Sequence, residues 1–142
     1  ERNIPVVVHI ILGLPGESRE TVLRTIDYLN RLPIQGVKLQ LLHVLSDSDL
    51  ADLYRAGEYT PLEKEEYLTL VGDCIAHLRA DIVLHRLTGD GDKNTLLAPL
   101  WSLRKRDVLN HLHRYLKENH IRQGMSCKID LSVIYNKPKD VL

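Results

Sequence analysis

A glycine-rich turn is the first place where this chain could hold a ligand. Residues 13–18, GLPGES, separate an apolar run from a stretch with helical spacing. Glycine lets a backbone approach a ligand closely, and the N–H groups at the start of a helix can bind a polar or anionic atom. The motif lacks the third glycine of G-x-G-x-x-G and the Lys-Ser/Thr of a Walker loop, so it does not favour phosphate binding. A turn that needs glycine only for its geometry is the alternative.

Two histidines stand near the ends of two later apolar runs and could act together. His43 and His85 occupy matching positions there, and a neutral imidazole can donate or accept a hydrogen bond. Arg86 and Asp90 follow His85 closely and add a guanidinium and a carboxylate. We expect the two histidines to line one pocket and all four side chains to bind a polar substrate. Core histidines with satisfied hydrogen bonds, and a salt bridge that fixes the loop, are the alternatives.

The metal-binding residue types do not form a recognisable metal site. Cys74 and Cys127 are the two cysteines, and no C-x-x-C motif joins them. The acidic stretches that begin at Asp47 and Asp90 resemble the start of an EF-hand loop, but both lack the glycine that such a loop needs at its sixth position. We therefore expect no metal ligands in this sequence.

The elements that would position these residues alternate between strands and helices. Thr60 and Glu63 have capping-box spacing and predict a helix start with Pro61 in its first turn. Strands that alternate with helices through short loops predict an α/β fold with parallel βα units, whose chemistry gathers at the carboxyl ends of the strands. The predicted strands are 6–12, 37–45 and 81–87, with a further short strand at 129–135, and the run at 6–12 is typical of a buried parallel strand. The first predicted helix has Ser18 as its N-cap and ends before Pro33. Further helices are predicted at 46–56, where Gly57 is the C-terminal stop, at 60–78 and at 102–119, and a long glycine-rich loop is predicted after the strand 81–87.

Composition limits the class of protein. The 142 residues are enough for one ordinary domain, and 19 basic residues balance 19 acidic residues, so no net charge draws the chain to nucleic acid or to an anionic membrane. No apolar run approaches the roughly 20 residues of a membrane span, and no segment resembles a signal peptide. We therefore expect a cytoplasmic protein without a membrane partner.

Three stretches together resemble a known family. They are VVVHIILGLPGES at 6–18, the segment 37–71 with LYRAGEYTPL inside it, and DIVLHRLTGDG at 81–91. In this order they resemble the C-terminal half of radical S-adenosylmethionine (radical SAM) enzymes, with the closest likeness to an uncharacterised bacterial subgroup related to the Elongator-type catalytic core. Anaerobic coproporphyrinogen oxidases are more distant.

The resemblance implies a fold, a reaction and two groups of site residues. The fold would be the C-terminal half of a partial (β/α)6 TIM-like barrel over residues 1–124, with 125–142 as a short extension. The complete enzyme would be an iron-sulfur oxidoreductase that cleaves S-adenosylmethionine to a 5′-deoxyadenosyl radical, which acts on an unknown substrate. The cofactor-binding residues implied by the resemblance are Gly13, Leu14, Pro15, Gly16, Glu17, Val44 and Leu45.

The sequence departs from the family at two places. It has no C-x-x-x-C-x-x-C motif for the [4Fe-4S] cluster, and Ser46-Asp47-Ser48 stands where relatives carry a Gly-Thr pair. We therefore expect a fragment that contains no catalytic residue, is inactive alone, and has the missing N-terminal half of the barrel as its partner. Its uncovered strand edge predicts edge pairing or a homo-oligomer. A non-catalytic α/β module that binds a nucleotide or a partner is the alternative.

Overall fold

The structure is a computed structural model that describes residues 4–89, 91–130 and 134. Strands and helices alternate along the chain, as the sequence predicts. The elements are β1 (Val7–Leu12), α1 (Arg19–Leu29), β2 (Gly36–Leu41), β3 (Val44–Leu45), α2 (Asp49–Arg55), α3 (Lys64–His77), β4 (Val83–Arg86), β5 (Leu96–Ala98), the 3-10 helix η1 (Leu100–Leu103) and α4 (Lys105–Glu118).

The main sheet has three parallel strands in the order β1-β2-β4. All six residues of β1 pair with β2 in unbroken register, from Val7 opposite Gly36 to Leu12 opposite Leu41. β4 pairs only with the first half of β2, and an irregularity between Val37 and Lys38 shifts its register. The prediction of parallel βα units is confirmed, and β1 and β2 end opposite each other at one edge of the sheet.

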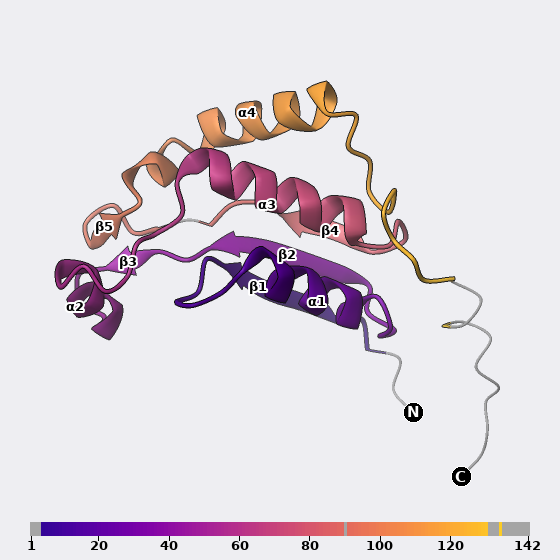
Figure 1. Ribbon diagram of the computed structural model, residues 1–142, viewed down its shortest axis with the longest axis horizontal. Helices are drawn as coiled ribbons and strands as arrows, with labels where there is room; N and C mark the ends of the chain where they lie inside the picture. Colours follow the sequence, from indigo (N-terminus) through magenta and orange to yellow (C-terminus); the bar gives the residue numbers. More distant parts are fainter. Residues whose placement is uncertain (1–3, 90, 131–133, 135–142) are drawn as a thin grey trace, which may run out of the picture.

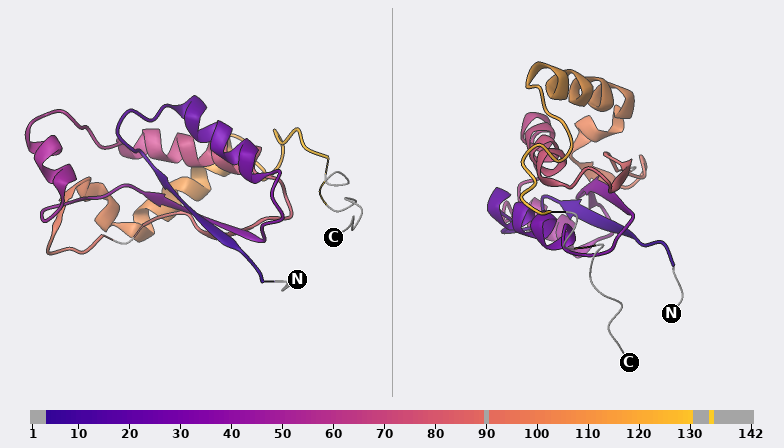
Figure 2. Two further views of the ribbon diagram at one scale, coloured as in Figure 1. Left: turned by 90° about the horizontal axis from the view of Figure 1, so that it is seen from below. Right: turned by 90° about the vertical axis from the view of Figure 1, so that its right-hand side faces the viewer.

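The helices cover only one face of this sheet. Val37, Leu39 and Leu41 alternate along β2 and are buried with residues of α1, α3 and α4 in one apolar core. In Figure 1, α3 and α4 lie above β2 and β4, and from below the strands lie in front of these two helices (Figure 2). The opposite face is uncovered: Ile11 is 43% exposed and Val83 is 57% exposed. The sequence predicted a buried strand at 6–12, which is wrong for the part of the chain that the structure describes, because β1 lies at the edge of the sheet and every second residue of it is exposed.

A second, smaller sheet breaks the strand predicted over 37–45. β2 ends at Leu41, and β3 pairs antiparallel with β5 instead of continuing the main sheet. Val44 is opposite Ala98, and both pack with Ala51 and Tyr59 in a small core of their own. The long loop predicted after β4 therefore contains a strand, because residues 96–98 find a partner only through this tertiary contact.

The two predicted helix starts have different outcomes. Ser18 caps α1 in a capping box with Thr21, so its predicted role is confirmed. The predicted cap at Thr60 is wrong, because α3 starts three residues later in a capping box between Glu63 and Glu66. Residues 59–62 are held outside the helix by tertiary contacts, such as the hydrogen bond that Trp101 Nε1 donates to the Leu62 carbonyl at 3.2 Å.

A buried polar cluster ties the far ends of α1 and α3 together. The Arg79 guanidinium donates to the carbonyls of Asn30 and Ile34 and forms an ion pair with Asp81 at 2.9 Å. The Asn30 side chain accepts from the Arg79 backbone N–H at 2.9 Å. Such pairing is needed because an unpartnered buried charge is costly. The cluster fixes the helix layer against the start of β4.

The segment after α4 returns to α3. The backbone N–H groups of Gly124 and Ser126 donate to the carbonyls of Ile75 and Ala76, so residues near the expected boundary at 124–125 pack on the same helix layer. The strand predicted at 129–135 falls mostly on residues outside those described, and residues 129 and 130 are not in a strand. Among the residues that the structure describes, no helix is long and apolar enough to cross a membrane.

Candidate functional site: the rim at the strand ends

The glycine turn lies at the end of β1 and is held by its own glutamate. Glu17 Oε2 accepts from the N–H of Gly13 at 3.0 Å and from that of Leu14 at 3.3 Å. Gly13 and Gly16 have φ of +90° and +73°, which L side chains rarely adopt. Leu14, Pro15 and Gly16 are exposed. The Glu17 carboxylate therefore shapes the turn, while the three residues at its tip are open to a ligand.

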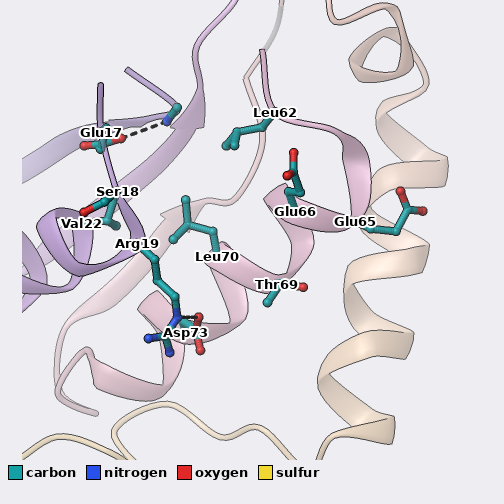
Figure 3. Close-up of a pocket in the computed structure, with 11 residues that line it drawn as sticks. Glu17, Ser18, Arg19, Val22, Leu62, Glu65, Glu66, Thr69, Leu70 and Asp73 are labelled. Atoms are coloured by element: carbon teal, nitrogen blue, oxygen red, sulfur yellow. Dashed lines mark hydrogen bonds and ion pairs between the residues drawn. The ribbon is translucent and has the colours of Figure 1, made fainter. Parts of the chain in front are cut away.

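A cavity of about 410 Å³ lies on the helical side of this turn, between the N-terminal ends of α1 and α3 (Figure 3). Val22, Leu62 and Leu70 supply its apolar lining. The ion pair between Arg19 and Asp73 crosses it from α1 to α3. This cavity is behind the turn and is separated from the uncovered face of the sheet by the strands.

His43 lies beside the loop that follows β4, at the edge of the main sheet where β1 and β2 end. We call this edge the rim. A Cβ added to Gly89 would lie 2.9 Å from the His43 ring, so only glycine fits there, and one added to Gly91 would lie 3.4 Å from it. His43 Nε2 is 3.1 Å from Ser102 Oγ, whose single hydrogen is donated to the Pro99 carbonyl. Asp90, which joins the two glycines, is outside the described residues.

His85 is not at the rim, which differs from the shared pocket that the sequence predicts. A Cβ added to Gly36 would lie 2.5 Å from the His85 ring, so this ring covers the first residue of β2. His43 comes two residues after Leu41, the last residue of β2. The five steps along the strand from Gly36 to Leu41, at about 3.3 Å each, separate the His85 ring from the end of β2 by about 16 Å. The irregular register of β4 places Arg86 opposite Lys38. His85 and Arg86 together line a cleft of about 320 Å³ between β4 and α4. The substrate-binding role of all four residues stays a prediction.

Val44 and Leu45 lie in the small second sheet. Val44 is fully buried, its backbone included, whereas Leu45 is half-buried. Their cofactor contact, like that of the glycine turn, stays a prediction.

The uncovered face of the sheet carries polar side chains that the sequence analysis missed. His9 on β1 is exposed, and Lys38 and Gln40 on β2 are half-buried between the covered positions Val37, Leu39 and Leu41. The signal was present, because a histidine inside an apolar run and a polar residue at every second position both indicate a face that is not buried against helices.

The residues present do not fit an iron-sulfur cluster. The cluster of the family that this sequence resembles needs the three cysteines of a C-x-x-x-C-x-x-C motif, and this chain has two cysteines, which do not form that motif. Burial raises the pKa of the Cys74 thiol to about 12, which keeps it protonated. No group of three or more His, Cys, Asp or Glu side chains that could hold a metal ion occurs within residues 4–89, 91–130 and 134.

A comparison with known protein families assigns this chain to one of them. Residues 34–118 match a family model, the radical SAM C-terminal domain. This match covers more than half of the 142 residues, so the chain belongs to the radical SAM C-terminal domain family.

Individual relatives agree with this assignment. The chain is 33% identical to Protein YhcC of Escherichia coli over 122 residues, 33% identical to Uncharacterized protein YtqA of Bacillus subtilis over 124, and 34% identical to Uncharacterized protein MJ0486 of Methanocaldococcus jannaschii over 125. These matches cover 86–87% of this chain. The chain spans about two fifths of the length of these curated relatives, namely 38–40%.

A solved structure shares the fold. The archaeal Methanocaldococcus infernus Elp3 with an N-terminal deletion superposes with a TM-score of 0.70 over 84% of this chain and 28% of its own, at 16% identity. The resemblance to a radical SAM C-terminal half is therefore confirmed.

Proposed function

We propose that the complete protein is a radical SAM enzyme and that this chain supplies the C-terminal half of its partial (β/α)6 barrel. Bound S-adenosylmethionine and a reduced [4Fe-4S] cluster together supply a 5′-deoxyadenosyl radical that abstracts hydrogen from a substrate. The cluster would be held by a C-x-x-x-C-x-x-C motif outside this chain. Residues 1–142 are therefore inactive alone.

The uncovered face of the sheet is the observation that carries this proposal. A complete barrel has helices outside and a closed ring of strands inside, and a part of it keeps its helices on one face only. β1, at one edge of the sheet, exposes Val7 and Ile11 on the uncovered face. Strands from the N-terminal half would pair with β1 and enclose His9, Lys38 and Gln40 in a shared interior.

This chain's residues have two tasks in that enzyme. The exposed tip of the glycine turn, Leu14 to Gly16, offers backbone groups and an apolar side chain to the adenine of the cofactor, and Glu17 keeps the tip in place. Val44 and Leu45 add a second contact to the cofactor. His43, His85, Arg86 and Asp90 orient the substrate by hydrogen bonds and charge.

Formation of 5′-deoxyadenosine tests the proposal. The complete protein is purified without oxygen, reconstituted with iron and sulfide, and incubated with S-adenosylmethionine and dithionite, and the product is measured by mass spectrometry. We expect 5′-deoxyadenosine from the complete protein, and none from a matched variant with alanines at its three motif cysteines or from residues 1–142 alone. A complete protein that forms no 5′-deoxyadenosine would overturn the proposal and favour a binding module without catalysis.

A further inference from the structure

Two buried tyrosines connect the crossover between β2 and β4 to the ends of both neighbouring strands. Tyr59 is 7% exposed and donates its hydroxyl to the Gly13 carbonyl at 2.7 Å, directly after β1. Tyr67 is fully buried and donates to the Leu87 carbonyl at 2.9 Å, directly after β4. The same kind of hydrogen bond therefore fixes two separate loops, and only the first of them is the glycine turn.

Tyr59 completes the set of contacts that hold Gly13. The Gly13 carbonyl comes after the last residue of β1, so the strand ladder does not hold it, and its φ of +90° leaves few other conformations that fit. Glu17 accepts from the Gly13 N–H on one side, and Tyr59 donates to the carbonyl on the other. Both main-chain polar groups of this residue are thus fixed by side chains.

The position of Tyr59 is itself set by packing. Its ring is buried in the small core with Val44, Ala51 and Ala98. Leu62, three residues further on, lies against the α-carbon of Gly13, since a Cβ added there would be 3.1 Å from Leu62 Cδ1. Burial first and the Glu17 charge second raise the pKa of Tyr59, so the hydroxyl stays a donor at neutral and moderately alkaline pH.

We propose that Tyr59 is a positioning residue that holds the glycine turn in the conformation which receives the adenine of S-adenosylmethionine. It acts through the Gly13 carbonyl and does not itself touch the cofactor. Because Tyr59 belongs to the same small core as Val44, one side chain links the two strands assigned to the cofactor, β1 and β3. This inference rests on the proposed function.

The test compares Tyr59→Phe with Tyr67→Phe in the complete protein. Both substitutions remove one hydroxyl from a buried ring that donates to a main-chain carbonyl, so they are matched in chemistry and differ in which loop is released. We expect Tyr59→Phe to raise the KM for S-adenosylmethionine in 5′-deoxyadenosine formation by about five- to twentyfold, the loss of one hydrogen bond, with kcat within about twofold. Tyr67→Phe should leave that KM within about twofold. Tyr28→Phe, at a site 63% exposed, controls for the loss of a hydroxyl as such.

A second measurement does not depend on activity. Deuterium uptake by peptides covering 12–18 should rise in Tyr59→Phe and not in Tyr67→Phe. If the wild type forms 5′-deoxyadenosine and Tyr59→Phe changes neither the KM nor the uptake, the inference is wrong and the proposed function stands. If the wild type forms no 5′-deoxyadenosine, the proposed function is wrong. Equal deuterium uptake at 12–18 in both variants would in that case also show that Tyr59 does not hold the glycine turn.

Discussion

Replacing Gly13 with alanine should destabilise the protein through two separable effects. The first is the backbone cost of an L residue at φ +90°, about 1–2 kcal/mol. The second is a contact, because the new methyl group would lie 3.1 Å from Leu62 Cδ1 and 3.2 Å from its Cγ. Such overpacking costs about 1 kcal/mol at least. We therefore expect Gly13→Ala to lower the free energy of unfolding by about 2–3 kcal/mol.

Gly57 provides the matched control for this substitution. Its φ is +74°, and no heavy atom lies within 4 Å of the position that a Cβ would take. Gly57→Ala should therefore show only the backbone cost. Urea denaturation followed by circular dichroism gives both values, and Leu62→Ala in combination with Gly13→Ala should recover about 1 kcal/mol as a coupling energy. Equal losses for the two glycines, together with no coupling to Leu62, would refute this explanation of the turn.

Four further predictions follow from the described residues. Arg79→Ala should lower the free energy of unfolding by about 3–5 kcal/mol in urea denaturation, because it removes the guanidinium from two buried carbonyls and an ion pair; a loss under about 1 kcal/mol would contradict this. Iodoacetamide at pH 8 should modify the partly exposed Cys127 and spare the buried Cys74, and equal labelling of both in mass spectrometry would show that Cys74 is not buried. The raised pKa of Cys74 also predicts that the free energy of unfolding falls as the pH rises from 9 towards about 12. The Lys64 ammonium holds the pKa of Asp107 below its usual value. The ion pair therefore stabilises the folded protein above the pKa that Asp107 has in the unfolded chain, and this stabilisation is lost as the pH falls through the pKa of the folded state. Asp107→Asn should reduce the loss of stability at acid pH. Residues 1–142 alone should form dimers or bind a hydrophobic dye, and a monomer in light scattering without dye binding would argue against an uncovered sheet face.

The local sequence predicted those features that neighbouring residues determine. Ser18 and Thr21 are three residues apart and cap α1 without help from the rest of the chain. The apolar spacing of α3 likewise predicts its buried stripe, including Cys74. Gly57, at φ +74° beyond the last residues of α2, ends that helix where a left-handed residue was expected.

Features that depend on distant contacts could not be predicted in this way. Thr60 has a sound capping pattern, but Tyr59 and Leu62 are held by Gly13, 46 residues or more away, and the helix begins later. Similarly, residues 96–98 have little strand pattern and become β5 only because β3 is beside them.

The same distinction between local and distant contacts applies to the candidate site. The glycine turn at 13–17 could be predicted from its composition, whereas the separation of His43 from His85 could not. That separation follows from the register of β4, which pairs with the first half of β2 and places the His85 ring over Gly36. The prediction that His43 and His85 occupy matching positions assumes that their strands end at the same level, whereas β4 is shorter than β2.

An experimental structure of the complete protein with S-adenosylmethionine bound tests the central claim most directly. The claim is that the uncovered face and the edge of β1 belong to the interior of a barrel completed by the rest of the protein. The account predicts a further parallel strand hydrogen-bonded along Val7–Leu12 and the adenine ring against residues 13–17. An edge of β1 that stays unpaired, or a cofactor bound away from the glycine turn, would contradict it.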